Sequence, residues 1–206
     1  MMLISDIRQT SPGRLTVRLE DGTGIKTTLG VVTDLRLYSG RELDASAVEE
    51  LKTASVRALA RERAIEMLSR RAMSRAEMRR KLIEKGEDED TAEHVTAWLC
   101  DHALIDDESY AAAVARHYAA KGYGAGRVRA ELSRRGIERE LWDGAIGAMS
   151  ENEDKIDKFI ASRLHDPEDR DEVRKLSNAL YRRGYSWDEI RRALERHRAE
   201  AEIYED

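Results

Sequence analysis

The sequence is poor in cysteine, proline and phenylalanine, with one, two and one residues respectively among 206. A single thiol, Cys100, excludes an intramolecular disulfide and fits a reducing compartment. Few prolines and a charged content of 37% are typical of a highly charged helical protein with little sheet. No stretch approaches the roughly 18 apolar residues that span a membrane, and residues 1–10 lack the apolar run of a signal peptide. We therefore expect a cytoplasmic protein without a membrane segment.

Motifs for metal binding or catalysis are also scarce. The five histidines are scattered, and one cysteine cannot supply the paired ligands of a structural zinc site. The glycine-rich residues 122–126 lack the Lys-Ser or Lys-Thr pair of a P-loop. Asp106 and Asp107 are the best candidates for a Mg²⁺ site, but acids at this place favour capping of the helix that follows. We therefore expect that the protein is not an enzyme and that it binds no metal and no cofactor.

Charge is segregated along the chain. The formal net charge of −5 argues against a uniformly basic nucleic-acid binder. Residues 61–85 nevertheless hold nine Lys or Arg against four Asp or Glu, and residues 174–198 hold eight against three. Local fields decide which surface meets a polyanion, so the net charge alone does not exclude DNA binding.

The sequence does contain a block that occurs three times. Each copy is a basic amphipathic helix with a central leucine, then a glycine four residues later, then a second amphipathic helix. The leucines are Leu82, Leu132 and Leu180, and the glycines are Gly86, Gly136 and Gly184. Glycines 50 and 48 residues apart indicate a tandem array, and such arrays usually build a long binding surface rather than a catalytic pocket.

The first 43 residues follow a different pattern. Alternation at residues 14–19, the turn signal Asp21-Gly22 and residues 25–29 predict two strands joined by a turn. Residues 31–38 are a further strand candidate. This β-rich part is too short to hold a core alone, so we expect it to pack on the first helix.

Helical periodicity begins at Asp44, a candidate N-cap. The expected helices cover residues 45–53, continuing or bending into 56–71, then 74–86, 90–102, 106–121, 127–135, 138–149, 153–164, a helix ending at 183, and a last one after 186. Capping boxes at Ser74 and Ser186 open two of them. The predicted fold is mainly α, with three tandem three-helix repeats forming an elongated curved array. The predicted divisions are a β-rich extension (1–43), repeat 1 (44–105), repeat 2 (106–150), and repeat 3 with an acidic tail (151–206).

The basic helices are the candidate binding surface. In the segment 127–135 Val128 and Leu132 share the buried face, so Arg127, Arg134 and Arg135 are expected to project outward beside a flexible glycine loop. Repeated arginines suit a phosphate backbone or an acidic protein groove. The alternative to a binding surface is that these arginines are solvated and form ion pairs with acids at i, i+4. We expect such ion pairs to be sparse in repeats two and three.

Aromatic residues lie close to these helices. Tyr118, Tyr123, Tyr181, Tyr185 and Trp187 could stack on unpaired bases. Aromatic residues near repeat junctions are more often core, so we expect Tyr181 and Trp187 to be buried. The role of Tyr123, in the glycine-rich loop, stays open.

Several short motifs occur in a characteristic order between residues 61 and 198. They are Ser74-Arg-Ala-Glu-Met-Arg-Arg-Lys-Leu82, Leu104-Ile-Asp-Asp107, Lys121-Gly-Tyr-Gly124, Glu131-Leu-Ser-Arg-Arg-Gly-Ile137 and Tyr181-Arg-Arg-Gly-Tyr-Ser-Trp187. Together they resemble the RecX family, bacterial regulators of the RecA recombinase. The resemblance implies an all-α array that binds RecA and its filament on single-stranded DNA. It also implies inhibition of strand exchange and ATPase activity, in DNA recombination, repair and SOS control, with no catalytic residues.

With this resemblance we expect a monomer whose partners are RecA and its filament, with direct binding to DNA left open. The residues expected to contact RecA or DNA are Lys121, Arg127, Arg134, Arg135, Arg182, Arg183, Arg191 and Arg192. A free-standing helix-turn-helix regulator, which would bind one duplex sequence, is the main alternative. A Mg²⁺-dependent nuclease and a purely structural adaptor are the others.

Overall fold

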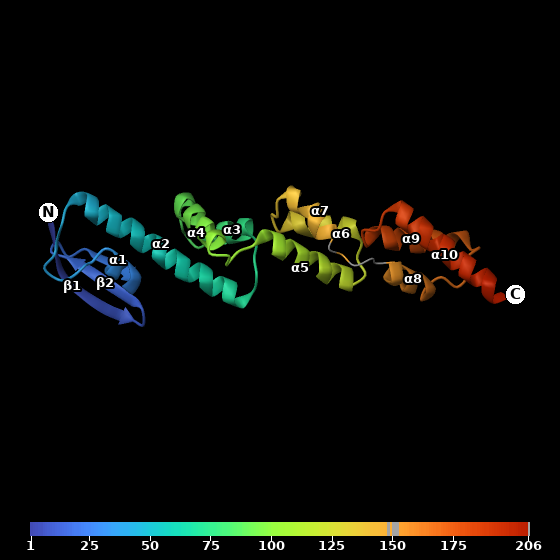
Figure 1. Cartoon of the computed structure of the whole chain (residues 1–206), viewed down its shortest axis with the longest axis horizontal. Helices are drawn as coiled ribbons and strands as arrows, with labels where there is room; N and C mark the ends of the chain where they lie inside the picture. The colour runs from blue at the N-terminus through green and yellow to red at the C-terminus, as the bar shows by residue number, and fades with distance from the viewer. Residues whose placement is uncertain (148, 150–152, 206) are drawn as a thin grey trace. The chain divides into compact units, whose positions relative to one another are not determined.

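The chain folds into two units with different architectures, and the computed structural model describes residues 1–147, 149 and 153–205. Unit 1 consists of Met1–Met73 and Glu77–Ile105, and unit 2 of Ser74–Ala76 and Asp106–Asp206. Unit 1 carries a small sheet and a helical part. The described part of unit 2 is helical. Figure 1 labels helices and strands of both units and colours them along the chain.

The sheet of unit 1 is antiparallel, in the order β3-β2-β1-β4. Its strands are β1 (Met2–Ser11), β2 (Arg14–Leu19), β3 (Gly24–Thr28) and β4 (Glu42–Leu43). The pairing of β2 with β3 confirms the two predicted strands. Strand β1 was not predicted, because a register shift between Ile4 and Asp6 breaks the alternation that marks a strand in sequence.

The strand predicted at residues 31–38 is wrong. The chain there forms the short helix α1 (Leu29–Asp34), which begins where the Thr28 hydroxyl accepts the N–H of Val31 at 3.4 Å. Apolar residues at 31, 32 and 35 fit a helical turn as well as a strand. The N-cap at Thr28 therefore decides between the two.

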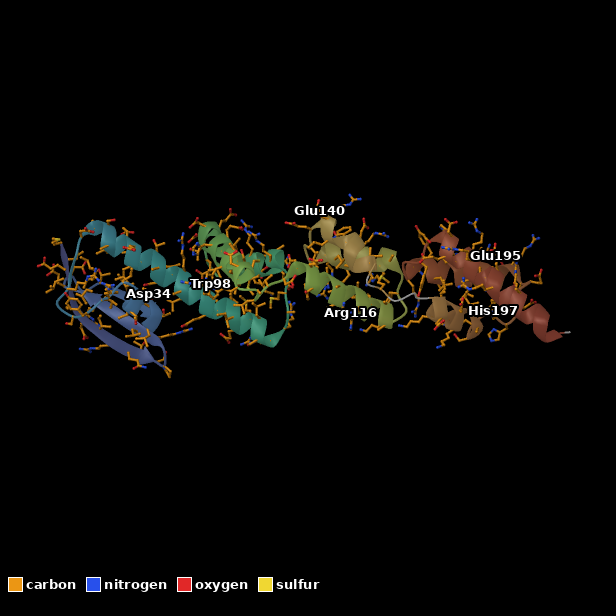
Figure 2. All side chains as sticks on the ribbon, viewed as in Figure 1. Asp34, Trp98, Arg116, Glu140, Glu195 and His197 are labelled. Carbon is orange, nitrogen blue, oxygen red and sulfur yellow. The ribbon has the colours of Figure 1, made fainter. Side chains whose placement is uncertain are left out.

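One long helix, α2 (Ala45–Arg70), serves both parts of unit 1. Asp44 caps it as predicted, accepting the N–H of Ala47 at 2.7 Å. Its first half packs Val48 and Leu51 onto the core of the sheet, which confirms the expected contact between the β-rich part and the first helix. Its second half packs with α3 (Arg75–Glu84) and α4 (Glu89–Asp101). Trp98 of α4 lies against α2, with the Arg61 guanidinium 5.2 Å from its ring centroid (Figure 2).

Unit 2 contains two groups of helices, each with its own core. The first group is α5 (Asp107–Ala120), α6 (Ala125–Arg134), a 3₁₀ turn (Arg139–Leu141) and α7 (Trp142–Gly147). The second is α8 (Glu153–Ala161), α9 (Arg170–Arg182) and α10 (Trp187–Glu205). Val128 and Leu132 centre the first core, and Ile160 and Leu180 the second. Residue 148 of the predicted helix 138–149, and the side chains of the acidic tail, lie outside the described residues.

The repeated leucine and glycine have a clear structural role. The three leucine side chains, of Leu82, Leu132 and Leu180, are fully buried. The three glycines, Gly86, Gly136 and Gly184, take φ values of 96°, 69° and 92°. The residue after each glycine donates its N–H to the carbonyl of the repeat leucine at 3.1, 3.1 and 3.3 Å. The repeat is therefore a core anchor joined to a Schellman C-cap, which stops the helix with a left-handed glycine.

Candidate functional site

A backbone junction holds the start of α6 against the end of α9. The N–H of Gly124 donates to the carbonyl of Arg183 at 3.0 Å, and the N–H of Gly126 donates to that of Gly184 at 2.9 Å. A Cβ on Gly124 would lie 2.5 Å from the Gly184 oxygen, so a side chain does not fit there. The free N–H groups of one helix start thus satisfy the free carbonyls of another helix end. The stretch 122–126, expected as a flexible loop, is a close-packed junction.

A related junction joins residues 74–76 to the end of α6 within unit 2. The Ser74 hydroxyl donates to the carbonyl of Arg135 at 2.5 Å. A Cβ on Gly136 would lie 2.8 Å from that of Ala76. Arg135 and Arg183 both immediately precede a repeat glycine, so the same position of the repeat accepts a hydrogen bond in both junctions. The capping box expected at Ser74 stays a prediction.

The junction of α6 with α9 brings basic side chains from both helices to one cleft. The cleft, of about 430 Å³, is lined by Arg127 and Arg129 of α6 and by Tyr181 and Arg182 of α9. We call it the α6–α9 cleft. Arg127, Arg129 and Arg182 are exposed. Two of these three arginines were predicted as site residues, and Arg129 was missed.

Arg183 plays a more structural part than predicted. Its side chain is half-buried, and its guanidinium carbon lies 5.5 Å from the Tyr123 ring centroid and 4.4 Å from that of Phe159. It also donates to the carbonyl of Gly122 at 3.4 Å. Arg127 approaches the same Tyr123 ring at 5.9 Å. Tyr123 therefore packs between two arginines at the junction, where cation–π contacts stabilise the cleft.

Arg134 and Arg135 are paired with a buried acid, so the expected sparse pairing is wrong at this point. Glu131 is 4% exposed and accepts hydrogen bonds from Arg134 at 2.6 and 3.0 Å and from Arg135 at 2.8 Å. Arg135 also contacts the hydroxyl of Tyr110. The hydrogen bonds from Arg134 are the main reason that the pKa of Glu131 falls to about 2. Burial acts in the opposite direction and raises this pKa. Arg134 still keeps 70% of its side chain exposed, so it remains accessible to a partner.

Glu131 is expected to make the stability of unit 2 depend on acid pH. The folded pKa of about 2 lies below the ordinary value of 4.5. The stabilisation is therefore complete above pH 4.5 and is lost as the pH falls towards 2. Glu131→Gln should lower the free energy of unfolding by about 2 kcal/mol at pH 7 and flatten its pH dependence between 5 and 2.

Urea unfolding at a series of pH values measures this effect. The matched control is Glu140→Gln, which changes an exposed glutamate of the 3₁₀ turn (Figure 2). If Glu131→Gln and Glu140→Gln gave the same pH dependence, Glu131 would not have the role assigned to it.

Tyr181 and Trp187 were expected in the core, and this prediction is wrong. Each residue is 54% exposed, and the two rings stack with centroids 5.0 Å apart and planes at 16°. The core positions are taken by Leu180 and Tyr185, which are 0% and 4% exposed. Because side chains at consecutive helical positions point in different directions, burial of Leu180 turns Tyr181 outward.

The hydroxyl of Tyr185 is buried and has no hydrogen-bond partner among the described residues. Burial is also the main reason that the pKa of Tyr185 is raised. A buried hydroxyl without a partner costs about 1–3 kcal/mol, so Tyr185→Phe is expected to stabilise unit 2 by about 1 kcal/mol. Thermal unfolding measures this change. A clear loss of stability would mean that the hydroxyl is bonded in solution.

The remaining predicted site residues lie outside the lining of the α6–α9 cleft. Lys121 is exposed at the C-cap of α5. Arg191 forms an ion pair with Asp188 at 2.5 Å, and Arg192 donates to the Asp188 carbonyl at 3.3 Å. Both belong to the first turns of α10, where the capping box predicted at Ser186 is confirmed by hydrogen bonds in both directions with Glu189.

The acidic pair at the start of α5 acts as a capping group. Asp106 accepts the N–H of Ser109 at 3.0 Å, and this hydrogen bond lowers its pKa. Asp107 accepts the N–H of Arg75 at 2.9 Å, while burial raises its pKa. These contacts confirm Asp106 as an N-cap. Within the described ranges no three potential metal ligands come together. In the same part of the chain no helix has the length and apolar character needed to cross a membrane.

Three family models match the chain in sequence order. They are the first, second and third three-helix domains of RecX, at residues 60–99, 106–146 and 160–194. A "Regulatory protein RecX" from Xanthomonas citri is 36% identical over 135 residues, covering 64% of this chain and 83% of the relative. One from Vibrio campbellii is 31% identical over 137 residues, covering 65% and 88%. A solved structure described as "Crystal structure of regulatory protein RecX" has a TM-score of 0.74 and 27% identity, and covers 93% of this chain and 98% of its own.

Proposed function

Because the chain belongs to the RecX family of regulatory proteins, we propose that it binds RecA and the RecA filament on single-stranded DNA. Its main effect on RecA is inhibition of ATPase activity and strand exchange. The family assignment supports the choice of partner. The basic α6–α9 cleft supports the choice of surface.

The arginines supply the binding energy in this proposal. Arg127, Arg129 and Arg182 are exposed on two helices that backbone hydrogen bonds from Gly124 and Gly126 hold together. The fixed backbone brings the three guanidinium groups to one cleft, where they can bind carboxylates and phosphates together. A RecA filament offers both kinds of anion, on its protein surface and on its DNA. Attraction between such charges is expected to weaken as salt is added.

Inhibition in this proposal requires only that the protein occupies a site on the RecA filament. A protein seated on the filament blocks entry of a second DNA strand or addition of the next RecA subunit. The proposal requires no chemical reaction on this chain. Asp106 and Asp107, the candidates for metal binding, accept the backbone N–H groups of Ser109 and Arg75.

The single-stranded-DNA-dependent ATPase of RecA, titrated with this protein, tests the proposal. We expect the ATPase rate to fall as the protein is added. Loss at substoichiometric amounts would favour capping of filament ends, and loss only near stoichiometric amounts would favour occupancy of the groove. An unchanged rate, together with tight binding to one duplex sequence, would contradict the proposal and support the helix-turn-helix regulator.

A further inference from the structure

The stacked pair formed by Tyr181 and Trp187 links the end of α9 to the start of α10 at the surface of unit 2. Both residues are 54% exposed, although each carries a large aromatic ring. Tyr181 sits at the end of α9 and Trp187 at the first residue of α10. Aromatic surface in water is unfavourable, so an exposed pair of rings with defined stacking geometry indicates a binding surface.

Arginines lie on both sides of the pair. Tyr181 lines the α6–α9 cleft together with Arg127, Arg129 and Arg182. Trp187 lines a second hollow of about 220 Å³ with Arg191 and Arg198. Each ring of the pair therefore lines a hollow that has arginines in its wall.

Three acids lie near the pair, and one of them, Asp188, is paired with Arg191 at 2.5 Å. Glu189 in the α6–α9 cleft accepts hydrogen bonds from the backbone and hydroxyl of Ser186, both at 2.7 Å. Glu195 lines the second hollow on α10 (Figure 2). Five arginines and two glutamates line the two hollows, and Asp188 and Asp143 beside them contact Arg191 and Arg129, so the net charge stays positive. This charge complements a chain of phosphates.

We propose that the Tyr181–Trp187 pair is a stacking platform for unpaired bases of a single-stranded nucleic acid, with its phosphates bound by Arg127, Arg129 and Arg182. Flat aromatic surface beside arginines is the combination that binds single strands without sequence preference, because every base has a π-face and every nucleotide has a phosphate. The positive charge beside the rings favours a ligand that carries phosphates along with its flat bases. The inference goes beyond the proposed function, because it requires no RecA.

Binding of fluorescently labelled oligothymidylate and oligouridylate to the full chain tests the platform by anisotropy. Trp187→Ala and Tyr181→Ala are expected to raise the Kd about 10-fold each, since one stacked base is lost. Trp187→Phe keeps an aromatic ring and is expected to change the Kd less than 3-fold. Tyr38→Ala is the matched control, because Tyr38 is 63% exposed and lies in the other unit. Binding of oligothymidylate alone would identify DNA as the ligand.

Several results would overturn this inference. One is the absence of oligonucleotide binding by the unmodified chain, and another is an unchanged Kd in both alanine variants. A loss of affinity for the RecA filament with unchanged oligonucleotide binding would assign the pair to a protein contact instead. Far-ultraviolet circular dichroism of Trp187→Phe and of the alanine variants separates loss of binding from loss of fold. Binding that depends on Trp187, without any effect on RecA, would support the platform and contradict the proposed function.

Discussion

Replacing Gly184 with alanine is expected to lower the free energy of unfolding of unit 2 by at least about 3 kcal/mol. Two costs add in this variant. Gly184 has a φ of +92°, where a residue with a Cβ is strained by about 1–2 kcal/mol. A Cβ there would also lie 2.2 Å from the backbone nitrogen of Arg127, so the junction between α6 and α9 has to open. Urea unfolding followed by tryptophan fluorescence measures the change.

Gly144→Ala provides the matched control. Gly144 lies within α7, and a Cβ there would meet nothing within 4 Å. This variant is expected to keep or raise stability by about 0.5–1 kcal/mol, because alanine favours the helix over glycine. Gly124→Ala should resemble Gly184→Ala, since its Cβ would lie 2.5 Å from the Gly184 oxygen. If Gly184→Ala changed stability by less than about 0.5 kcal/mol, the rigid junction described here would be wrong.

The second large effect is expected from removal of the three arginines of the α6–α9 cleft. The triple variant Arg127→Ala, Arg129→Ala, Arg182→Ala should need about 100-fold more protein to halve the RecA ATPase rate, as expected if each exposed charge contributes about 1 kcal/mol. Stability should fall by no more than about 1 kcal/mol, from loss of the exposed cation–π contact of Arg127 with Tyr123. The three side chains are exposed, and the only ion pair they form among the described residues is a long contact of Arg129 with Asp143 at 4.0 Å.

A control for the triple variant removes the same charge elsewhere. Arg8→Ala, Arg70→Ala and Arg174→Ala together change three exposed arginines, whose side chains are 76%, 74% and 71% exposed. Inhibition by this control should stay within about 3-fold of that by the unmodified protein. Equal losses in the two triple variants would mean that net charge, and not the α6–α9 cleft, governs inhibition.

The repeat could be predicted from sequence because its signals are local. A buried leucine and a glycine four residues later mark one helix end, and the C-cap hydrogen bonds form within six residues. The same holds for the N-caps at Asp44 and Asp106 and for the capping box at Ser186. These contacts require no knowledge of distant parts of the chain.

Predictions that depended on distant contacts were less accurate. Tyr181 and Trp187 are exposed because Leu180 and Tyr185 fill the core, and the preference of aromatic residues for the core outweighed helical position in the prediction. Strand β1 was not predicted because its register shift breaks the alternation of apolar and polar residues. The role of residues 122–126 could not be predicted, since it requires knowing that α9 ends against them. For strand β1 and residues 122–126 the missing fact is a contact between residues far apart in sequence.

The candidate site was predicted in part. Two of the arginines predicted from the repeat, Arg127 and Arg182, line the α6–α9 cleft, and their contact with RecA or DNA stays a prediction. Their neighbours Arg134 and Arg135 bind Glu131 at i−3 and i−4, a helical pairing that the sequence allows but does not require. A count of arginines in the sequence therefore does not show which of them are free to bind a partner and which are paired with acids.

Direct binding of the labelled, unmodified chain to the RecA filament is the measurement that tests the central claim most directly. The fluorescence anisotropy of the labelled chain would be measured during titration with RecA on single-stranded DNA, with RecA alone and with bare DNA. Each titration would be repeated at several salt concentrations. We expect binding to the filament to be the tightest, to weaken as salt rises, and to be lost in the triple arginine variant. Absence of binding to the filament, or equal binding by the triple variant and the unmodified chain, would contradict the account.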